Sequence, residues 1–299
     1  MTLALIAGQG GLPPRLVRAM LDRGDVPVIC EIAQFPSDVK GDLPRLGFRL
    51  ETLGSFIATA KEIGVTRICM AGAMRRPPID PALIDAATMP LVPKVQAALA
   101  NSGDDGTLRI FTSIFEDAGM EVIGAADIDP SLLPPAGVTG SLPEGVARDI
   151  ATAEAALAEL AAEDKGQAVV VRDGTVIARE DVRGTDAMLA DLAPGMSGFT
   201  MPDDPFDTLV GSVTAWLSGT APVPEEPQGG ILFKAPKPGQ ELRVDMPLIG
   251  LRTVMRAAEA GLSGIVIEAG GVMMLDPDGV AEVLHAQQMF LWVRPRGGA

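Results

Sequence analysis

Short apolar runs alternate with amphipathic stretches through the first 130 residues of the chain. The apolar runs have the length of buried strands and lie at residues 3–7, 26–30, 66–72 and 120–125. The amphipathic stretches carry apolar side chains at helical spacing, and they lie at residues 13–24, 55–64, 93–100 and 106–119. Strands that alternate with helices predict a parallel sheet with helices on both faces, a wound Rossmann-like domain over residues 1–130.

The pattern changes after residue 130. Proline and glycine recur through residues 131–145 with no sustained period, so we expect this segment to be a linker. Residues 146–299 then mix helix and strand patterns, with an alanine-rich helix followed by a β-hairpin that turns at Asp173–Gly174. A further helix is expected over about residues 247–260. The sequence therefore predicts an α/β protein of two domains, a wound Rossmann-like N-terminal domain and a mixed α/β C-terminal domain.

Charge and hydropathy narrow the class of partner. The net charge is 24 − 39 = −15, and no stripe of lysine or arginine is present to neutralise phosphates, which argues against a nucleic-acid partner. An acidic body also gains nothing electrostatically from an anionic membrane surface. The first residues lack a charged leader, and no apolar run approaches the roughly 20 residues of a membrane span. We therefore expect a soluble cytoplasmic protein.

The scarcity of histidine and cysteine narrows the chemistry. The sequence has one histidine, His285, and two cysteines, each of which ends a strand-like run. A tetrahedral zinc site cannot be assembled from these residues, and a Ser-His-Asp triad would have to use a histidine on a predicted helix. Carboxylates, lysines, arginines and backbone amides remain. That set suits a hard cation such as Mg²⁺ and an anionic substrate.

Two glycine-bearing loops follow predicted strands of the first domain. The segments "AGQGGLP" (7–13) and "AGAMRRPP" (71–78) are expected at the same edge of the sheet, where amides, a helix N-terminus and arginines suit a phosphate. Tight turns and solvated arginines are the alternative interpretation. The candidate contacts to a nucleotide are Gly8, Gly10, Gly11, Leu12, Pro13, Gly72, Ala73 and Arg75.

Three acidic residues stand at predicted helix starts. Asp104 and Asp105 precede the helix at 106–119, and Asp186 follows Thr185 in "GTDAML". Such aspartates commonly cap a helix or complement its dipole. In a glycine-rich loop they can also hold a metal ion or ribose hydroxyls, and the sequence leaves both roles open.

The segment "LFKAPKPGQELRVDMP" (232–247) is the strongest chemical signal. It places Lys234, Lys237 and Arg243 beside Glu241 and Asp245 in a loop stiffened by proline and glycine. Asp245 could cap the helix expected near residue 247, but capping does not require three nearby cations. Cations of this kind orient phosphate oxygens, and a carboxylate among them binds a metal ion or positions water.

Together these motifs resemble one family. "LIAGQGGLP", "AGAMRRP", "GDDGTLR", "GTDAML" and "KAPKPGQELRVDMPLIG" fall in the order and approximate spacing of the cytoplasmic UDP-2,3-diacylglucosamine pyrophosphatases of the LpxI type. The resemblance implies hydrolysis of UDP-2,3-diacylglucosamine to UMP and 2,3-diacylglucosamine 1-phosphate in lipid A synthesis, with Mg²⁺ or Mn²⁺. It also implies a ligand cleft between the two domains that is lined by Thr185 and Asp186, an essential Asp245, and a homodimer.

The motifs and the resemblance give one hypothesis. The two glycine loops hold the UDP end, with Asp104 and Asp105 near the substrate. Lys237 and Arg243 draw charge from the diphosphate, with Lys234, Thr185 and Gln240 as further contacts. Asp245, with Asp186 and one metal ion, activates the attacking water. The acyl chains require an apolar groove, for which residues 195–206 are a candidate, and a lipid substrate implies transient contact with the inner membrane.

Two alternatives belong to other classes of protein. A dinucleotide-dependent oxidoreductase is suggested by the first glycine loop, and it requires an acidic residue about 20 positions on to bind a ribose, where Glu31 stands. A non-catalytic sensor of nucleotide-sugars would bind the same ligand and release no UMP.

Overall fold

The computed structural model describes residues 2–74, 78–100, 104–162, 165–193 and 228–296. The chain forms two compact units. The first contains Met1–Ser131 together with Glu241–Asp245, and the second contains Leu132–Gln240 and Met246–Ala299. A five-residue segment distant in sequence therefore folds with the N-terminal unit.

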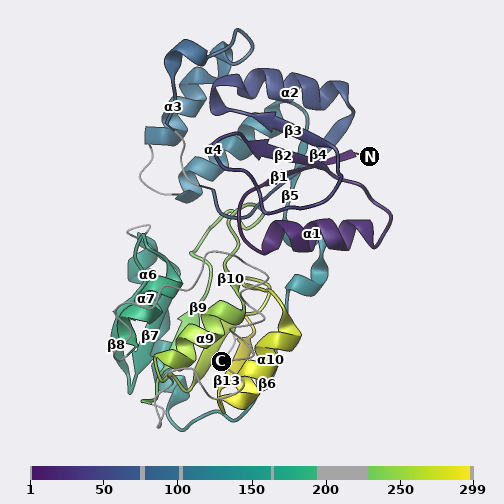
Figure 1. Ribbon diagram of the computed structural model, residues 1–299. Coiled ribbons are helices and arrows are strands. Elements are labelled where there is room, and N and C mark those ends of the chain that lie inside the picture. Colours follow the sequence, from purple (N-terminus) through teal and green to yellow (C-terminus); the bar gives the residue numbers. More distant parts are fainter. Residues whose placement is uncertain (1, 75–77, 101–103, 163–164, 194–227, 297–299) are drawn as a thin grey trace. The chain divides into compact units, whose positions relative to one another are not determined.

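The first unit is built on a five-stranded parallel sheet in the order β3-β2-β1-β4-β5. Its strands are β1 (Thr2–Ala7), β2 (Val28–Ile32), β3 (Arg45–Phe48), β4 (Val65–Ala71) and β5 (Glu121–Ile123). Its helices are α1 (Leu12–Leu21), α2 (Leu53–Glu62), α3 (Val92–Ala100), α4 (Asp104–Asp117) and α5 (Ala125–Ile128). Figure 1 shows α1 on one face of this sheet and α2 and α4 on the other.

Packing of the first unit follows the alternation of its strands. Ala4 and Ile6 of β1 point to the face where Phe56 of α2 and Phe115 of α4 are buried. The predicted parallel sheet is confirmed. Strand β3 was not predicted, because its residues are mostly exposed or half-buried at the sheet edge and include a glycine.

The second unit contains a six-stranded mixed sheet in the order β6-β13-β11-β9-β7-β8. Its strands are β6 (Gly137–Thr139), β7 (Ala168–Arg172), β8 (Thr175–Arg179), β9 (Ile231–Lys234), β11 (Gly264–Glu268) and β13 (Phe290–Arg294). The short strands β10 (Leu248–Ile249) and β12 (Met273–Met274) pair separately. The helices are α6 (Val146–Ala162), α7 (Thr185–Leu192), α9 (Leu251–Glu259) and α10 (Pro277–Ala286).

Two apolar layers cover this second sheet. The buried side chains of α6 pack on Val169 and Val171, whereas those of α7, α9 and α10 pack with Val170 on the opposite face. The predicted hairpin is confirmed, with Asp173 and Gly174 both at positive φ. The segment expected to be a plain linker contains β6, which pairs antiparallel with β13. That strand is short and exposed, so it left no hydrophobic pattern to recognise.

Candidate functional site

The two glycine loops of the first unit meet where its strand order reverses. Loop 8–11 follows β1 and loop 72–74 follows β4, and these strands are neighbours in the sheet. Gln9 and Ala73 form a β-bridge, with the two N–H···O distances at 2.8 and 2.9 Å. Gly8 is required for this approach, since a Cβ there would lie 2.5 Å from the Ala73 carbonyl oxygen. In wound sheets this reversal point is the usual place for a ligand.

Several amides of the first glycine loop already have protein acceptors. The Gly8 and Gln9 amides donate to the carbonyls of Ala71 and Ala73, and the Gly10 amide donates to Asp38 Oδ2 at 2.6 Å. Gly11 and Leu12 begin α1, and no acceptor for their amides lies in the described part of the chain. The next two residues are prolines without an N–H. The amides available to an anion are therefore fewer than the sequence suggested.

Some predicted contacts lie outside what the structure describes. Arg75 falls in residues 75–77, and the apolar candidate at 195–206 falls in residues 194–227, both outside the described ranges. Asp104 is the first residue of α4, and its side chain is likewise outside the described part.

Asp105 does more than complement its own helix. Its Oδ1 accepts the Glu241 backbone N–H at 2.8 Å, and its Oδ2 accepts Arg109 Nε at 2.7 Å. The hydrogen bond with Asp105 raises the pKa of Arg109. The contact with Glu241 joins α4 to a segment 136 positions later in the chain. Asp105 thus holds residues 241–245, which we call the 241–245 segment.

Arg243 is occupied by protein groups on all three guanidinium nitrogens. Nε and Nη2 donate to the two carboxylate oxygens of Glu241 at 2.9 and 2.8 Å. Nη1 donates to Glu116 at 2.7 Å and to the Val122 carbonyl at 3.3 Å. These contacts raise the pKa of Arg243, chiefly through Glu241, and tie the segment to α4 and β5. A direct role on the diphosphate stays a prediction, and it would require Arg243 to exchange these partners.

Asp245 is not a helix cap. Helix α9 begins at Leu251 with Gly250 as its N-cap residue, five positions after Asp245. The backbone N–H of Asp245 donates to the Glu241 carbonyl at 3.0 Å, and the Asp245 side chain is half-buried. The simplest structural explanation for this aspartate is therefore removed.

In the second unit, two predicted site residues and one glutamate form a buried chain of hydrogen bonds: Lys234, Thr185 and Glu180. Lys234 Nζ, at the end of β9, donates to Thr185 Oγ1 at 2.8 Å. The Thr185 hydroxyl donates to Glu180 Oε1 at 2.5 Å, and Glu180 Oε2 accepts the Gln167 N–H at 2.7 Å. Lys234, Thr185 and Glu180 are each less than 9% exposed. Glu180 was missed, because one acid after a strand looks in sequence like a surface residue.

Two other predicted residues of the second unit have internal roles. The Asp186 carboxylate forms an ion pair with Arg252 at 2.5 Å, which links α7 to α9. Gln240 Oε1 accepts the Lys237 N–H at 2.8 Å, and its Nε2 donates to Gln167 at 3.3 Å. Gln240 therefore shapes the loop that carries Lys237.

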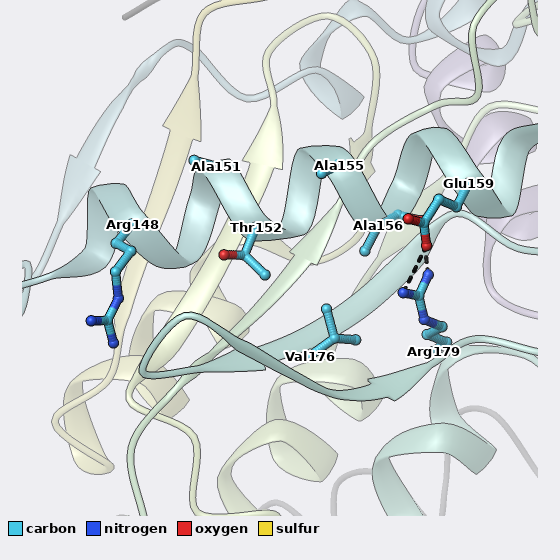
Figure 2. A pocket seen from close by; sticks show the side chains of 8 residues that line it. All are labelled: Arg148, Ala151, Thr152, Ala155, Ala156, Glu159, Val176 and Arg179. Carbon is cyan, nitrogen blue, oxygen red and sulfur yellow. Dashed lines mark hydrogen bonds and ion pairs between the residues drawn. The ribbon is translucent and has the colours of Figure 1, made fainter.

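A pocket lies between α6 and β8 (Figure 2). It is lined by small side chains and by Arg148, Glu159 and Arg179, of which the last two form an ion pair at 2.9 Å. None of the predicted site residues lines it. Among the residues that the structure describes, no three acidic, histidine or cysteine side chains gather as a metal site.

The surroundings of Glu31 argue against the oxidoreductase alternative, which requires this carboxylate to bind a ribose. Both oxygens of Glu31 are engaged, Oε1 by the backbone N–H and hydroxyl of Ser37 and Oε2 by Arg45 at 3.0 Å. Burial alone would raise the pKa of Glu31, but these hydrogen bonds and the Arg45 charge outweigh it and lower the pKa. The carboxylate is thus committed to the protein.

Comparison with known proteins agrees with the motifs. A model of the LpxI N-terminal domain matches residues 2–132, and a model of the LpxI C-terminal domain matches residues 135–292. The UDP-2,3-diacylglucosamine pyrophosphatase LpxI of Caulobacter vibrioides is 34% identical over 281 residues, which cover 93% of this chain and 92% of the relative. The resemblance inferred from the motifs is confirmed: the chain belongs to the LpxI family.

Proposed function

We propose that this protein hydrolyses the diphosphate bond of UDP-2,3-diacylglucosamine, which yields UMP and 2,3-diacylglucosamine 1-phosphate for lipid A biosynthesis. The observation that carries the proposal is the match to both LpxI domain models and to a pyrophosphatase of that name over nearly the whole chain. The half-buried Asp245 beside Arg243, outside any helix cap, supports the same chemistry.

Each unit contributes groups suited to part of this reaction. In the first unit, the amides of Gly11 and Leu12 suit the UDP phosphates, and Asp245 positions the attacking water. In the second unit, the cation of Lys237 neutralises charge on the diphosphate, and Lys234 keeps Thr185 in place. A well-aimed donor of this kind contributes roughly 3–4 kcal/mol to transition-state stabilisation.

A divalent cation, Mg²⁺ or Mn²⁺, is part of the proposal. The described carboxylates do not form a ready-made cage, and Asp186 is ion-paired with Arg252. They fit an ion that arrives with the substrate, since Mg²⁺ usually takes one or two carboxylates and completes its shell with water and phosphate oxygens. Asp245 and Asp186 would hold the ion, and Asp186 would have to exchange its ion pair with Arg252 to do so. When bound, the ion neutralises charge on the diphosphate.

The test is release of UMP from UDP-2,3-diacylglucosamine by purified protein with Mg²⁺ or with EDTA. We expect UMP with Mg²⁺ and little with EDTA. Asp245→Ala and Asp245→Asn should lower kcat by roughly 10²–10⁴-fold while the protein stays folded. Asp278→Asn, at an exposed position of α10, serves as the matched control. Near-normal turnover by Asp245→Ala would refute its role, and binding without UMP would favour the sensor.

A further inference from the structure

The 241–245 segment is covered by the C-terminal family model but folds with the N-terminal unit. We propose that Asp105 is a positioning residue: through Glu241 it fixes the backbone of Asp245, the carboxylate on which the reaction depends. The inference rests on the proposed function for the role of Asp245, and on contacts within the first unit for everything else.

Asp105 is connected to Asp245 through Glu241, by one hydrogen bond at each end of that residue's backbone. The Asp105 carboxylate accepts the Glu241 N–H at 2.8 Å. At the other end of the same residue, the Glu241 carbonyl accepts the amides of Val244 and Asp245 at 3.2 and 3.0 Å. Glu241 is therefore held from α4 and closes the turn that carries Asp245. Loss of the first bond releases the start of that turn.

Arg109 keeps the Asp105 carboxylate in the correct orientation. Its Nε donates to Oδ2 at 2.7 Å, one turn along α4, which leaves Oδ1 directed at the Glu241 amide. The Asp105 side chain is 22% exposed, so water competes only partly for it. A hydrogen bond to a charged group is stronger than one between neutral groups, and it favours one conformation of this five-residue turn.

Other contacts also hold the 241–245 segment on the first unit. Val244 packs against the apolar core of the first unit. Gly124 follows β5, and a Cβ there would lie only 3.3 Å from Arg243 Cα, so the glycine allows the two backbones to pack closely. Arg243 donates hydrogen bonds to Glu116 of α4 and to the Val122 carbonyl of β5, both in the first unit. These contacts keep the 241–245 segment on the first unit when Asp105 is changed. Asp105 determines the position that the segment takes there.

A direct role for Asp105 on a metal ion or on ribose makes a different demand on the side chain. A role as metal ligand depends on the negative charge, whereas a hydrogen bond from a ribose hydroxyl or from the Glu241 amide needs only an acceptor oxygen, which asparagine also has. The pair Asp105→Asn and Asp105→Ala therefore separates the metal role from the positioning role, and amide exchange of the 241–245 segment separates the ribose role from it. Asp149→Ala is the matched control, because Asp149 also accepts a backbone amide, that of Gly174, in the second unit.

Two measurements on the full-length protein test the inference: steady-state UMP release, and hydrogen–deuterium exchange of the peptide that contains Val244 and Asp245. For Asp105→Ala we expect faster exchange in that peptide and a kcat lowered roughly 10- to 100-fold, as expected of a misplacement of about 1 Å, with KM nearly unchanged. Asp105→Asn should lie between the wild type and Asp105→Ala in both properties, because its one oxygen can accept the Glu241 amide but its NH₂ group cannot accept Arg109 Nε. Asp149→Ala should change neither.

The outcomes distinguish this inference from the proposed function. If Asp105→Ala leaves the exchange of the 241–245 peptide unchanged, the positioning role is refuted. It is also refuted if Asp105→Asn lowers kcat as much as Asp105→Ala without faster exchange, which would make Asp105 a direct ligand. If the wild type releases no UMP, the proposed function fails, while the exchange of the two variants still decides whether Asp105 fixes the segment.

Discussion

At the scale of single residues, Glu180 shows how a buried acid can organise groups that the motifs emphasise. It accepts the Thr185 hydroxyl and the Gln167 amide, and Thr185 in turn accepts the Lys234 ammonium. Lysine and glutamate are seldom this deeply buried without a partner of opposite charge. Glu180 and Lys234 are therefore linked through one hydroxyl, that of Thr185.

Glu180→Ala should destabilise the protein, because it removes the buried acceptor of the Thr185 hydroxyl and of the Gln167 backbone N–H. We expect the free energy of unfolding, measured in urea, to fall by about 1–3 kcal/mol. The adjacent Asp181→Ala is the control: Asp181 is exposed and pairs only with Arg183 among the described residues, so little change is expected. Equal losses in the two variants would contradict the buried-chain explanation.

Arg243 and Asp173 show what single residues reveal in a sequence. Asp173–Gly174 was predictable as a turn because both positions require positive φ, a local property. Arg243 looked like a phosphate ligand because its neighbours in sequence are charged. Its partner Glu116 lies 127 positions earlier, so only the fold reveals that Arg243 ties the chain together.

At the scale of elements, the 241–245 segment depends on an ion pair that responds to pH. Both carboxylate oxygens of Glu241 accept hydrogen bonds from Arg243, and this lowers the pKa of Glu241 below 4.5. A carboxyl group with a depressed pKa stabilises the folded state fully above its unfolded pKa, and loses that contribution as pH falls through the folded value.

The comparison of wild type with Glu241→Gln should follow this sign. We expect the variant to be less stable by about 1 kcal/mol, a difference that stays constant from about pH 8 to about pH 5 and shrinks at lower pH. Urea unfolding at several pH values measures it. A difference that grows as the pH falls would show that Glu241 is not held as a carboxylate.

Elements also differed in how readily the sequence predicted them. Strands β1 and β4 of the parallel sheet were recognised because their apolar runs are largely buried. Strand β6 was not, since its three residues are exposed at the sheet edge. The helix expected from about residue 247 begins at Leu251, because residues 248–249 form β10 instead.

At the scale of the whole molecule, charge limits how a lipid substrate is approached. The chain carries a net charge of −15. No helix in the described ranges has the length and apolar character to cross a bilayer. We expect contact with a membrane to be apolar and local, because an anionic surface repels a protein with this net charge.

Vesicle co-sedimentation tests this expectation. Binding to vesicles rich in phosphatidylglycerol should be no stronger than binding to phosphatidylcholine vesicles at low salt, and raising the salt to about 0.5 M should not weaken it. Strong binding to the anionic vesicles that disappears in salt would instead reveal a basic surface that the net charge conceals.

The placement of the 241–245 segment has a consequence for how such proteins can change by recombination. A breakpoint near residue 132 separates the two matched family domains neatly, yet it also separates Asp105 from Glu241, which must fit each other. Halves inherited from different parents would carry a mismatched pair at the segment that contains Asp245. Recombination between related genes should therefore keep the two halves together, although the boundary between the two family domains looks like a suitable breakpoint.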